Sequence, residues 1–408
     1  VHFHPGGAER DLGQGVHGVS LFGRSNGSES STIAGPAGLC NDDRGMLQAV
    51  VSTSDRPQAP LFEGPLDVIG DVHGEIDALR ALLAHLGYAM DGSHPGGRRA
   101  VFVGDLCDRG PDSPAVLDLV MHWVQAGRAQ CVLGNHELNV LLGEPKHGNG
   151  WFFDRNHELA NGEFLNSRAA TGERRAAWVA FLERLPLALV RDDLRVVHAC
   201  WDDAALARLG PLLANGASYA AVHADLDRTA RDLLRGSGIN ARAAREVQAY
   251  RHMFKDRSAT LPLLPACADE ATLLQNANPV KVITSGLEGP SERPIWAGGR
   301  WRMTHRARWW NEYRDRPAVI VGHYWRRDDR AEPAAVTGDW DYPLGDYGAY
   351  DWMGPRANVF CVDYSVGGRY AERARGGRPP WQTRLAALRW PDCELVFDDG
   401  GRRTLAKP

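Results

Sequence analysis

The stretch LDVIGDVHG at residues 66–74 decides the fold, because a short apolar run ends there at glycine and two polar side chains. The run is rich in β-branched residues and is closed by glycine, a pattern typical of a buried β-strand followed by a sharp turn. Asp71 and His73 come directly after this expected strand. A carboxylate and an imidazole at the end of a buried strand are candidate metal ligands.

Four more short apolar runs end at a polar residue in the same way. They are residues 100–104 before Asp105, 131–134 before Asn135, 194–197 before His198 and 318–322 before His323. Residues 76–86 and 116–124 separate the first three runs and carry apolar residues at helical spacing. Strands that alternate with helices predict an α/β fold whose strand ends share one edge, where ligands bind. We therefore expect all five strand ends to meet in one crevice.

The composition is that of an ordinary globular protein. The 408 residues are 43% hydrophobic and 24% charged, which excludes a collagen-like, coiled-coil or wholly disordered chain. No apolar run approaches the roughly 20 residues of a membrane-spanning helix, and the N-terminus does not resemble a secretion signal. A net charge of −4 predicts no overall attraction to nucleic acid or anionic lipid. Seven scattered cysteines without a CxxC pair fit a reducing compartment, so we expect a cytoplasmic protein without a membrane partner.

The chain divides into a tail, a core in two parts and an insertion. Residues 1–60 are rich in Gly, Ser and Asp, have no helix or strand period and begin without methionine. We expect a mobile tail or an over-extended start there, with a small docked subdomain as the alternative. Residues 61–201 and 317–408 are the expected core, and residues 202–316 are the expected insertion.

The expected insertion returns to the same sheet, so we expect it to cap the crevice or to flank it. It is rich in Ala, Arg and Leu and helical at first, and then irregular through Pro262, Pro265, Pro279, Pro290 and Pro294. Beyond it, the runs 358–363, 384–390 and 394–397 are expected strands that close a second sheet.

The polar residues at the strand ends suggest two metal ions rather than one. Carboxylate, imidazole and amide oxygen ligands suit Mn²⁺, the favoured ion, with Fe²⁺, Zn²⁺, Ni²⁺ or Mg²⁺ as alternatives. The Asp105 carboxylate can bridge two ions about 3.5–4 Å apart, as in two-metal hydrolases. The candidate ligands are Asp71, His73 and Asp105 for the first ion, and Asn135, His198 and His323 for the second.

Such a metal pair suits attack of a bridging hydroxide on phosphorus, because it acidifies water and neutralises phosphate oxygens. The leaving alkoxide then needs a proton. His136 follows Asn135 directly and is the expected general acid, with Asp108 as the partner that keeps it protonated. Arg109 offers a planar, two-pronged donor to phosphate oxygens.

The motifs GDVHG at 70–74, GDLCDRG at 104–110 and GNHE at 134–137, followed by two single histidines, resemble a known family. They are similar to the phosphoprotein phosphatase branch of the calcineurin-like metallophosphoesterases. The resemblance implies a two-sheet β-sandwich core flanked by helices, with a helical or irregular insertion. It also implies a dinuclear metal centre and the residue roles given above.

Two departures from the eukaryotic serine/threonine phosphatases point toward bacterial relatives. Leu133 stands where those enzymes carry an arginine, and Ala199 and Cys200 stand where they carry two glycines. The chain looks closer to symmetrical diadenosine tetraphosphatases and to the phosphatase module of bacterial polynucleotide kinase-phosphatases. In the latter an aspartate like Asp363 belongs to the active site, so Asp363 is a secondary candidate for substrate binding. The alternative is that Asp363 caps a turn at the end of a strand.

The leading functional expectation is a phosphatase for phosphomonoesters, with phosphoserine or phosphothreonine in proteins as the first substrate. The alternative is a dinucleoside polyphosphate hydrolase or a nucleic-acid end phosphatase. A second alternative is a non-catalytic metal- or nucleotide-sensing module, which the absence of a glycine-rich phosphate loop disfavours. The arginine- and tryptophan-rich segment 300–316 could stack bases, but we favour a helix with solvated arginines and buried tryptophans. His305 is expected to be structural or exposed.

Overall fold

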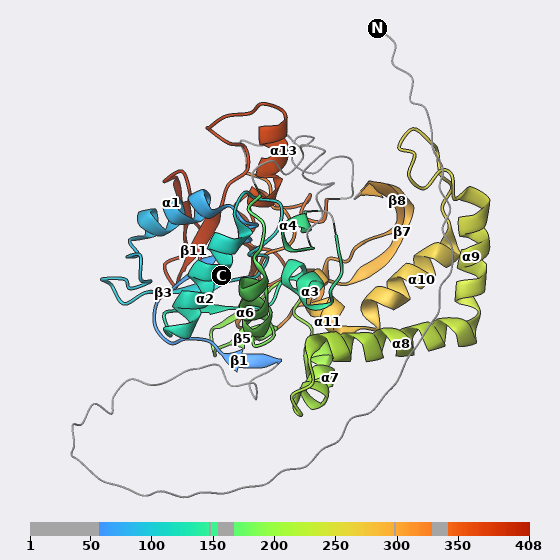
Figure 1. Cartoon of the computed structure of the whole chain (residues 1–408), viewed down its shortest axis with the longest axis horizontal. Helices are drawn as coiled ribbons and strands as arrows, with labels where there is room; N and C mark the ends of the chain where they lie inside the picture. The colour runs from blue at the N-terminus through green and yellow to red at the C-terminus, as the bar shows by residue number, and fades with distance from the viewer. Residues whose placement is uncertain (1–56, 147, 154–166, 298, 329–341) are drawn as a thin grey trace, which may run out of the picture. The chain divides into compact units, whose positions relative to one another are not determined.

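A computed structural model describes residues 57–146, 148–153, 167–297, 299–328 and 342–408. Its centre is a pair of β-sheets (Figure 1). One sheet has six strands in the order β13 (Arg402–Thr404), β12 (Glu394–Phe397), β11 (Ala386–Trp390), β2 (Leu66–Ile69), β3 (Arg99–Phe102) and β4 (Ala129–Cys131). The other has five, in the order β1 (Gln58–Pro60), β5 (Ala188–Val190), β6 (Leu194–Val197), β9 (Ala318–Val321) and β10 (Val359–Cys361).

The two sheets pack face to face around an apolar core. Val68 and Val101 from the six-stranded sheet join Val196, Ile320 and Phe360 from the five-stranded sheet in one fully buried cluster. Alternation along each strand sends every second side chain to the opposite face, where helices cover it. This arrangement confirms the expected sandwich flanked by helices.

The helices α1 (Ile76–Leu86) and α2 (Ser113–Gln125) form where apolar residues recur at helical spacing. Phe102, on the outer face of β3, belongs to the same buried cluster as Leu79 of α1 and Val120 of α2. Gly87 ends α1 in the left-handed conformation, and Asp112 begins α2 by accepting a hydrogen bond from the backbone N–H of Ala115. Both helices confirm the prediction from the sequence.

The strands that carry the predicted site run parallel within each sheet. β2, β3 and β4 are parallel neighbours, and so are β6, β9 and β10. Four of the five predicted strands occupy the expected positions, whereas β4 ends at Cys131 and leaves residues 132–134 as a loop. All five expected site loops therefore follow strands.

Two expectations about strands are wrong. β11 and β12 extend the six-stranded sheet beside β2 instead of closing the other sheet, because the backbone of β11 pairs antiparallel with β2. The last residues of the expected tail, Gln58–Pro60, form β1, which pairs in parallel with β5. The rest of the expected tail, residues 1–56, lies outside the described residues.

The expected insertion is more regular than its prolines suggested. Its elements are α7 (Asp203–Leu213), α8 (Tyr219–Ser237), α9 (Ile239–Tyr250), α10 (Pro265–Asn276), α11 (Pro279–Ser285), β7 (Glu288–Ala297), β8 (Arg300–Arg306) and the 3-10 turn η2 (Trp309–Glu312). Pro265 and Pro279 each open a helix, where a missing backbone N–H costs nothing. Pro290 and Pro294 lie in β7 beside an irregularity in its pairing with β8.

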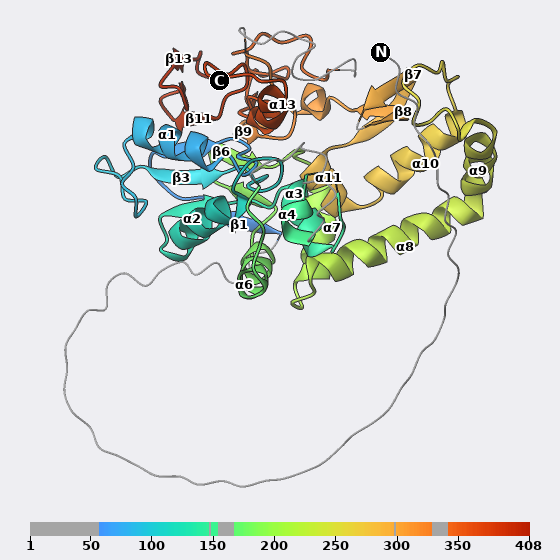
Figure 2. The same cartoon turned by 45° about the horizontal axis from the view of Figure 1, so that its top comes forward.

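The segment 300–316 is a strand followed by a 3-10 turn, so the favoured helix is also wrong. Trp309 and Trp310 are nevertheless buried in the main core, as expected. α8, α9, α10 and the β7–β8 hairpin lie together on the side away from α1 and α2 (Figures 1 and 2).

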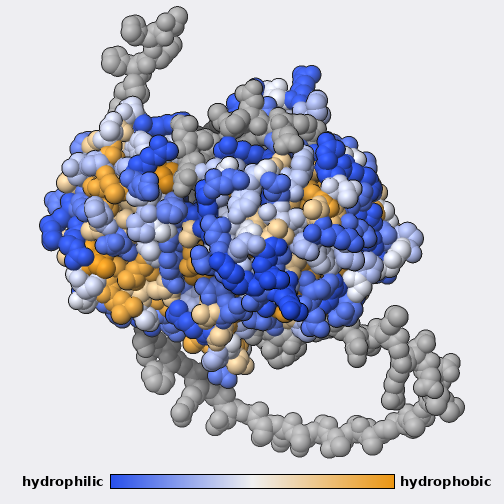
Figure 3. Space-filling view, turned by 180° about the vertical axis from the view of Figure 1, so that it is seen from behind, coloured by the Kyte–Doolittle hydropathy of each residue, from blue (hydrophilic) through white to orange (hydrophobic). Residues whose placement is uncertain are grey.

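Smaller elements complete the described part of the chain: α3 (Asn135–Leu141), α4 (Gly150–Phe153), α6 (Gly172–Leu182), the 3-10 turn η3 (Val366–Gly368) and α13 (Arg369–Ala374). Seen from behind, the surface is mostly hydrophilic, with apolar residues gathered toward one side (Figure 3). Among the described residues, no helix has the length and apolar character needed to cross a membrane.

Candidate metal centre

The loops after β2, β3, β4, β6 and β9 bring the predicted ligands together. His73, Asp105 and His136 form one group in which the potential ligand atoms all lie within 4.8 Å of one another. Asp105, His198 and His323 form a second such group. Asp105 belongs to both groups, the position that the sequence assigned to a bridging carboxylate.

Asp71 lies in the same site but outside these two groups. Its Oδ2 is 3.9 Å from Nε2 of His73. The same oxygen accepts a hydrogen bond of 3.0 Å from the backbone N–H of His323. Asp71 therefore links the loop after β2 to the loop after β9, across the two sheets.

Backbone carbonyls orient two of the histidines. Nδ1 of His73 lies 3.1 Å from the carbonyl oxygen of Cys107, and Nδ1 of His198 lies 2.7 Å from that of Val103. A proton on each Nδ1 would satisfy these bonds and leave a lone pair on Nε2, which in His73 lies 2.9 Å from Nη1 of Arg109. Both Nε2 atoms face Asp105, at 3.7 Å for His73 and 3.3 Å for His198. The orientation is the one that a metal-binding imidazole needs.

The predicted ligands of the second ion also converge. Oδ1 of Asn135 lies 3.2 Å from Nε2 of His198 and 2.8 Å from Nδ1 of His323. Asn135 is the first residue of α3, while the two histidines end strands of the other sheet. An amide oxygen and two imidazole nitrogens thus meet at the junction of the sheets.

The electrostatics of the site fit divalent cations. Burial raises the pKa of Asp71 well above its usual range, and the negative charges of Asp363 and Asp105 raise it further. Burial lowers the pKa values of His73 and His323, which favours neutral imidazoles. Burial opposes a charge on His198, but the Asp105 carboxylate raises its pKa. Despite burial, the neighbouring histidines hold the pKa of Asp105 well below its usual range. Buried carboxylates and imidazoles that interact this strongly form the donor set that Mn²⁺, Fe²⁺ or Zn²⁺ would satisfy.

The predicted acid dyad is formed. Nδ1 of His136 lies 2.6 Å from Oδ2 of Asp108, and both side chains are buried. The other oxygen of Asp108 accepts a hydrogen bond of 2.7 Å from Nε1 of Trp151 on α4. Asp108 is thus fixed on two sides, and it holds the imidazole with Nε2 toward the site.

Arg109 lies among the predicted catalytic groups. Its Nη1 is 2.9 Å from Nε2 of His73, and its Nη2 is 3.0 Å from Nε2 of His136. The guanidinium carbon lies 4.9 Å from the ring centre of Trp325, within range of a cation–π contact. Trp325 was not singled out from the sequence, since a tryptophan two residues after His323 has no motif around it.

Asp363 holds the backbone that presents Trp325. Its Oδ2 accepts from the backbone N–H of Trp325 and its Oδ1 from that of Ser365, both at 2.8 Å. Burial raises the pKa of Asp363. These bonds match the turn-capping interpretation of Asp363, and they place it behind Trp325.

Sequence reasoning missed Glu137, the last residue of the GNHE motif. Its fully buried carboxylate accepts hydrogen bonds of 2.8 Å from the backbone N–H groups of Asp105 and Leu106. It also accepts from the backbone N–H groups of Cys107 and Gly134. Glu137 therefore shapes the loop that carries Asp105, and its place in the motif was the available signal.

Backbone strain is concentrated in these loops. Six non-glycine residues of the site have positive φ: His73 (47°), Asp105 (49°), Asp108 (75°), Arg109 (69°), His323 (69°) and Trp325 (53°). Such conformations persist only where surrounding contacts hold them, and they are common at active sites. Gly367 shows how tight the packing is, because a Cβ there would collide with the ring of His73. The backbone of η3 at Gly367 therefore packs directly against the ring of His73.

Comparison with known proteins agrees with this geometry. Residues 64–209 match the family model of the calcineurin-like phosphoesterases. The chain is similar to a bis(5′-nucleosyl)-tetraphosphatase PrpE, asymmetrical, of Anoxybacillus flavithermus, with 34% identity over 143 residues, 33% of this chain and 55% of that protein. It is also similar to a symmetrical bis(5′-nucleosyl)-tetraphosphatase of Ralstonia nicotianae, with 40% identity over 77 residues, 19% of this chain and 24% of that protein.

The chain spans about half the length of the Anoxybacillus flavithermus protein and about a quarter of the Ralstonia nicotianae protein. Among solved structures, it is similar to a cold-active protein-tyrosine phosphatase of a Shewanella species, with 17% identity and a TM-score of 0.41. That match covers 88% of this chain and 85% of the other. The family match spans the loops after β2, β3, β4 and β6, so this chain carries a calcineurin-like phosphoesterase domain.

Proposed function

We propose that this protein is a dinuclear metal-dependent phosphoesterase. The observation that carries the proposal is the sharing of Asp105 between two groups of potential ligands, one of which also contains His136, with Arg109 beside His136. His73 and Asp71 on one side, and Asn135, His198 and His323 on the other, would complete the coordination. Bound there, two divalent ions would activate water and neutralise phosphate oxygens.

The chain's own residues supply the rest of the chemistry. Arg109 binds phosphate oxygens through its two terminal nitrogens, which in this structure contact Nε2 of His73 and of His136 and would turn from them to the phosphate. His136 gives the leaving oxygen a proton from Nε2, and Asp108 keeps Nδ1 protonated and the ring oriented. Because Asp108 is held by Trp151 as well, the ring has little freedom to turn away.

We place dinucleoside polyphosphates first among the substrates. The support is the similarity to bis(5′-nucleosyl)-tetraphosphatases of both the asymmetrical and the symmetrical kind. This choice reverses the order expected from the motifs, which put phosphoserine and phosphothreonine first. Phosphoprotein remains the second candidate, because the GNHE and GDxxDRG motifs resemble phosphoprotein phosphatases.

One assay tests both the phosphoesterase reaction and the substrate class. Purified protein loaded with Mn²⁺ is incubated with p-nitrophenyl phosphate, diadenosine tetraphosphate, a phosphopeptide and a 3′-phosphorylated oligonucleotide. We expect turnover that EDTA abolishes and that Asp105→Asn lowers by at least about a thousandfold, since both ligand groups lose a shared carboxylate. The fastest substrate chooses between the candidates. If metal-loaded protein hydrolyses none of them, the phosphoesterase proposal fails and a sensing module is favoured.

A further inference from the structure

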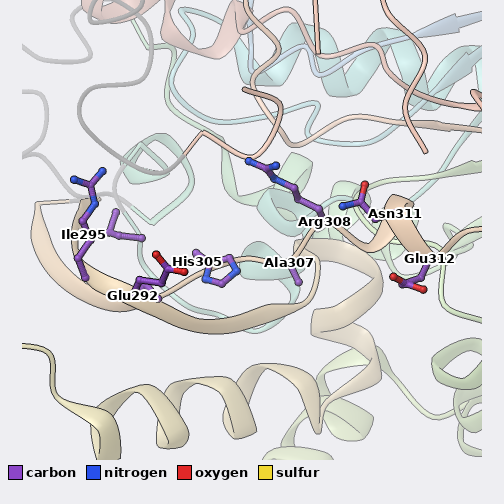
Figure 4. Close-up of a pocket in the computed structure, with 9 residues that line it drawn as sticks. Glu292, Ile295, His305, Ala307, Arg308, Asn311 and Glu312 are labelled. Carbon is purple, nitrogen blue, oxygen red and sulfur yellow. The ribbon is translucent and has the colours of Figure 1, made fainter. Parts of the chain in front are cut away.

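The insertion builds a pocket of about 780 Å³ between the β7–β8 hairpin and η2 (Figure 4). Its size lies within the roughly 300–1,000 Å³ that is typical of sites for small molecules. The lining residues come from both strands of the hairpin and from the turn: Ser291, Glu292, Arg293, Ile295, His305, Ala307, Arg308, Asn311 and Glu312. The predicted metal ligands are absent from this lining, so the pocket is distinct from the metal centre.

The pocket wall is joined to the loops of the metal centre through the buried Trp309, which follows the lining residue Arg308. Nε1 of Trp309 donates to the carbonyl oxygen of Ala199, at 3.0 Å, and lies 3.2 Å from the hydroxyl oxygen of Tyr324. Ala199 comes directly after His198, and Tyr324 directly after His323. The pocket wall is therefore anchored next to two of the predicted ligands.

Several polar groups of the pocket lack a partner in the part of the chain that the structure describes. Ser291 is 6% exposed, and its hydroxyl is buried without a hydrogen bond. The side chains of Arg293 and His305 have no hydrogen bond or ion pair there. A buried hydroxyl without a partner is unfavourable, so such a group indicates a ligand that would satisfy it.

The mixture of groups points to a nucleotide. A guanidinium binds phosphate oxygens, and the carboxylates of Glu292 and Glu312 can accept from ribose hydroxyls. The Oδ1 atom of Asn311 accepts from the hydroxyl of Tyr347, at 3.3 Å, so its NH₂ group is left to donate to a base edge. The two carboxylates would repel a bare anion, and an apolar leaving group would offer the arginine no hydrogen-bond acceptor.

We propose that this pocket binds the nucleoside end of a nucleoside polyphosphate, with Ser291, Arg293 and Asn311 as contacts, while the phosphate chain reaches the metal centre. The inference rests on the proposed phosphoesterase function and names its substrate class. Under this proposal the insertion selects the substrate, and the core carries out the reaction.

The test compares a substrate that fills the pocket with one that does not. Arg293→Ala and Asn311→Ala are suitable variants because both side chains are exposed, so folding is not at risk. We expect the KM for diadenosine tetraphosphate to rise about tenfold for Arg293→Ala, which loses a hydrogen bond to a charged group, and about three- to tenfold for Asn311→Ala, which loses a neutral one. The kcat/KM for p-nitrophenyl phosphate stays unchanged. Arg300→Ala, an exposed arginine on the same hairpin but outside the pocket, is the matched control.

Binding gives a readout that needs no turnover. Calorimetry with ADP in the absence of metal should show binding to the wild type and to Arg300→Ala, and binding at least fivefold weaker for Arg293→Ala. Equal ADP affinity and equal KM in all variants would overturn the pocket assignment, as would a wild type that does not bind ADP. Loss of p-nitrophenyl phosphate turnover in the wild type would instead count against the proposed function.

Discussion

The loops around Asp105 and the pocket of the β7–β8 hairpin differ in how far the hydrogen bonds of their polar side chains are satisfied within the protein. In the loops the polar groups are held by the protein itself: Asp108 contacts both His136 and Trp151, and Glu137 accepts four backbone hydrogen bonds. In the hairpin, Ser291 and Arg293 have no such partner among the described residues. The polar groups of the loops are preorganised for chemistry, whereas those of the pocket have hydrogen-bonding capacity left for a ligand.

The largest effect that tests this contrast is the loss of the general acid. His136→Ala should slow hydrolysis of a substrate with an alkoxide leaving group by about 10²–10⁴-fold, because that leaving group needs a proton. An activated aryl phosphate should lose far less, since its leaving group departs without protonation. The measurement is kcat for both substrates, with His252→Ala, an exposed histidine of the insertion, as the control. Equal losses on both substrates would remove His136 from this role.

A smaller effect is expected when the loop loses its internal anchor. Glu137→Gln keeps the shape but turns an oxygen into an NH₂ donor that faces backbone N–H groups. We expect the free energy of unfolding to fall by about 1–3 kcal/mol, with weaker Mn²⁺ binding, because Asp105 is no longer held in place. Urea denaturation and metal titration measure these changes, and the exposed Glu173→Gln serves as the control. An unchanged metal affinity would contradict the anchoring role.

The smallest effect concerns the wall behind Arg109. Trp325→Leu removes the aromatic face beside the guanidinium, a contact worth about 0.5–2 kcal/mol. We expect inorganic phosphate to inhibit the Trp325→Leu variant about three- to tenfold more weakly than the wild type. The KM for p-nitrophenyl phosphate should rise more than its kcat falls. Trp325→Phe should restore most of the lost phosphate inhibition. Trp381→Leu is the matched control, because Trp381 faces a different arginine, Arg369. If both leucine variants weaken inhibition equally, Trp325 has no special part in the site.

The same contrast explains what could be predicted from the sequence. The residues of the core loops follow strands and form dense motifs, so strand ends alone indicated that Asp71, Asp105 and His198 would meet. Glu137 was missed because it acts through backbone groups of a loop some thirty residues away, which spacing does not reveal. Trp325 was missed because its contact with Arg109 depends on a left-handed backbone that Asp363 stabilises.

The insertion was the least predictable region, and for a physical reason. Its prolines suggested irregular structure, but their effect depends on position: Pro265 opens a helix, whereas Pro290 lies in a two-stranded hairpin. The pocket itself brings β7 and η2 together, and no period or motif in the sequence marks that contact. Its exposed residues, such as Arg293 and Asn311, carry little signal because no apolar period or motif contains them.

The pairing of β6 with β9 has a consequence for redesign. These strands are direct neighbours, and each ends at a predicted metal ligand, although the whole insertion separates them along the chain. Everything that the insertion contributes is thus attached at two adjacent points of a rigid scaffold. Transplanting a different segment between those points should retarget the enzyme to another phosphate ester while His198 and His323 keep their spacing.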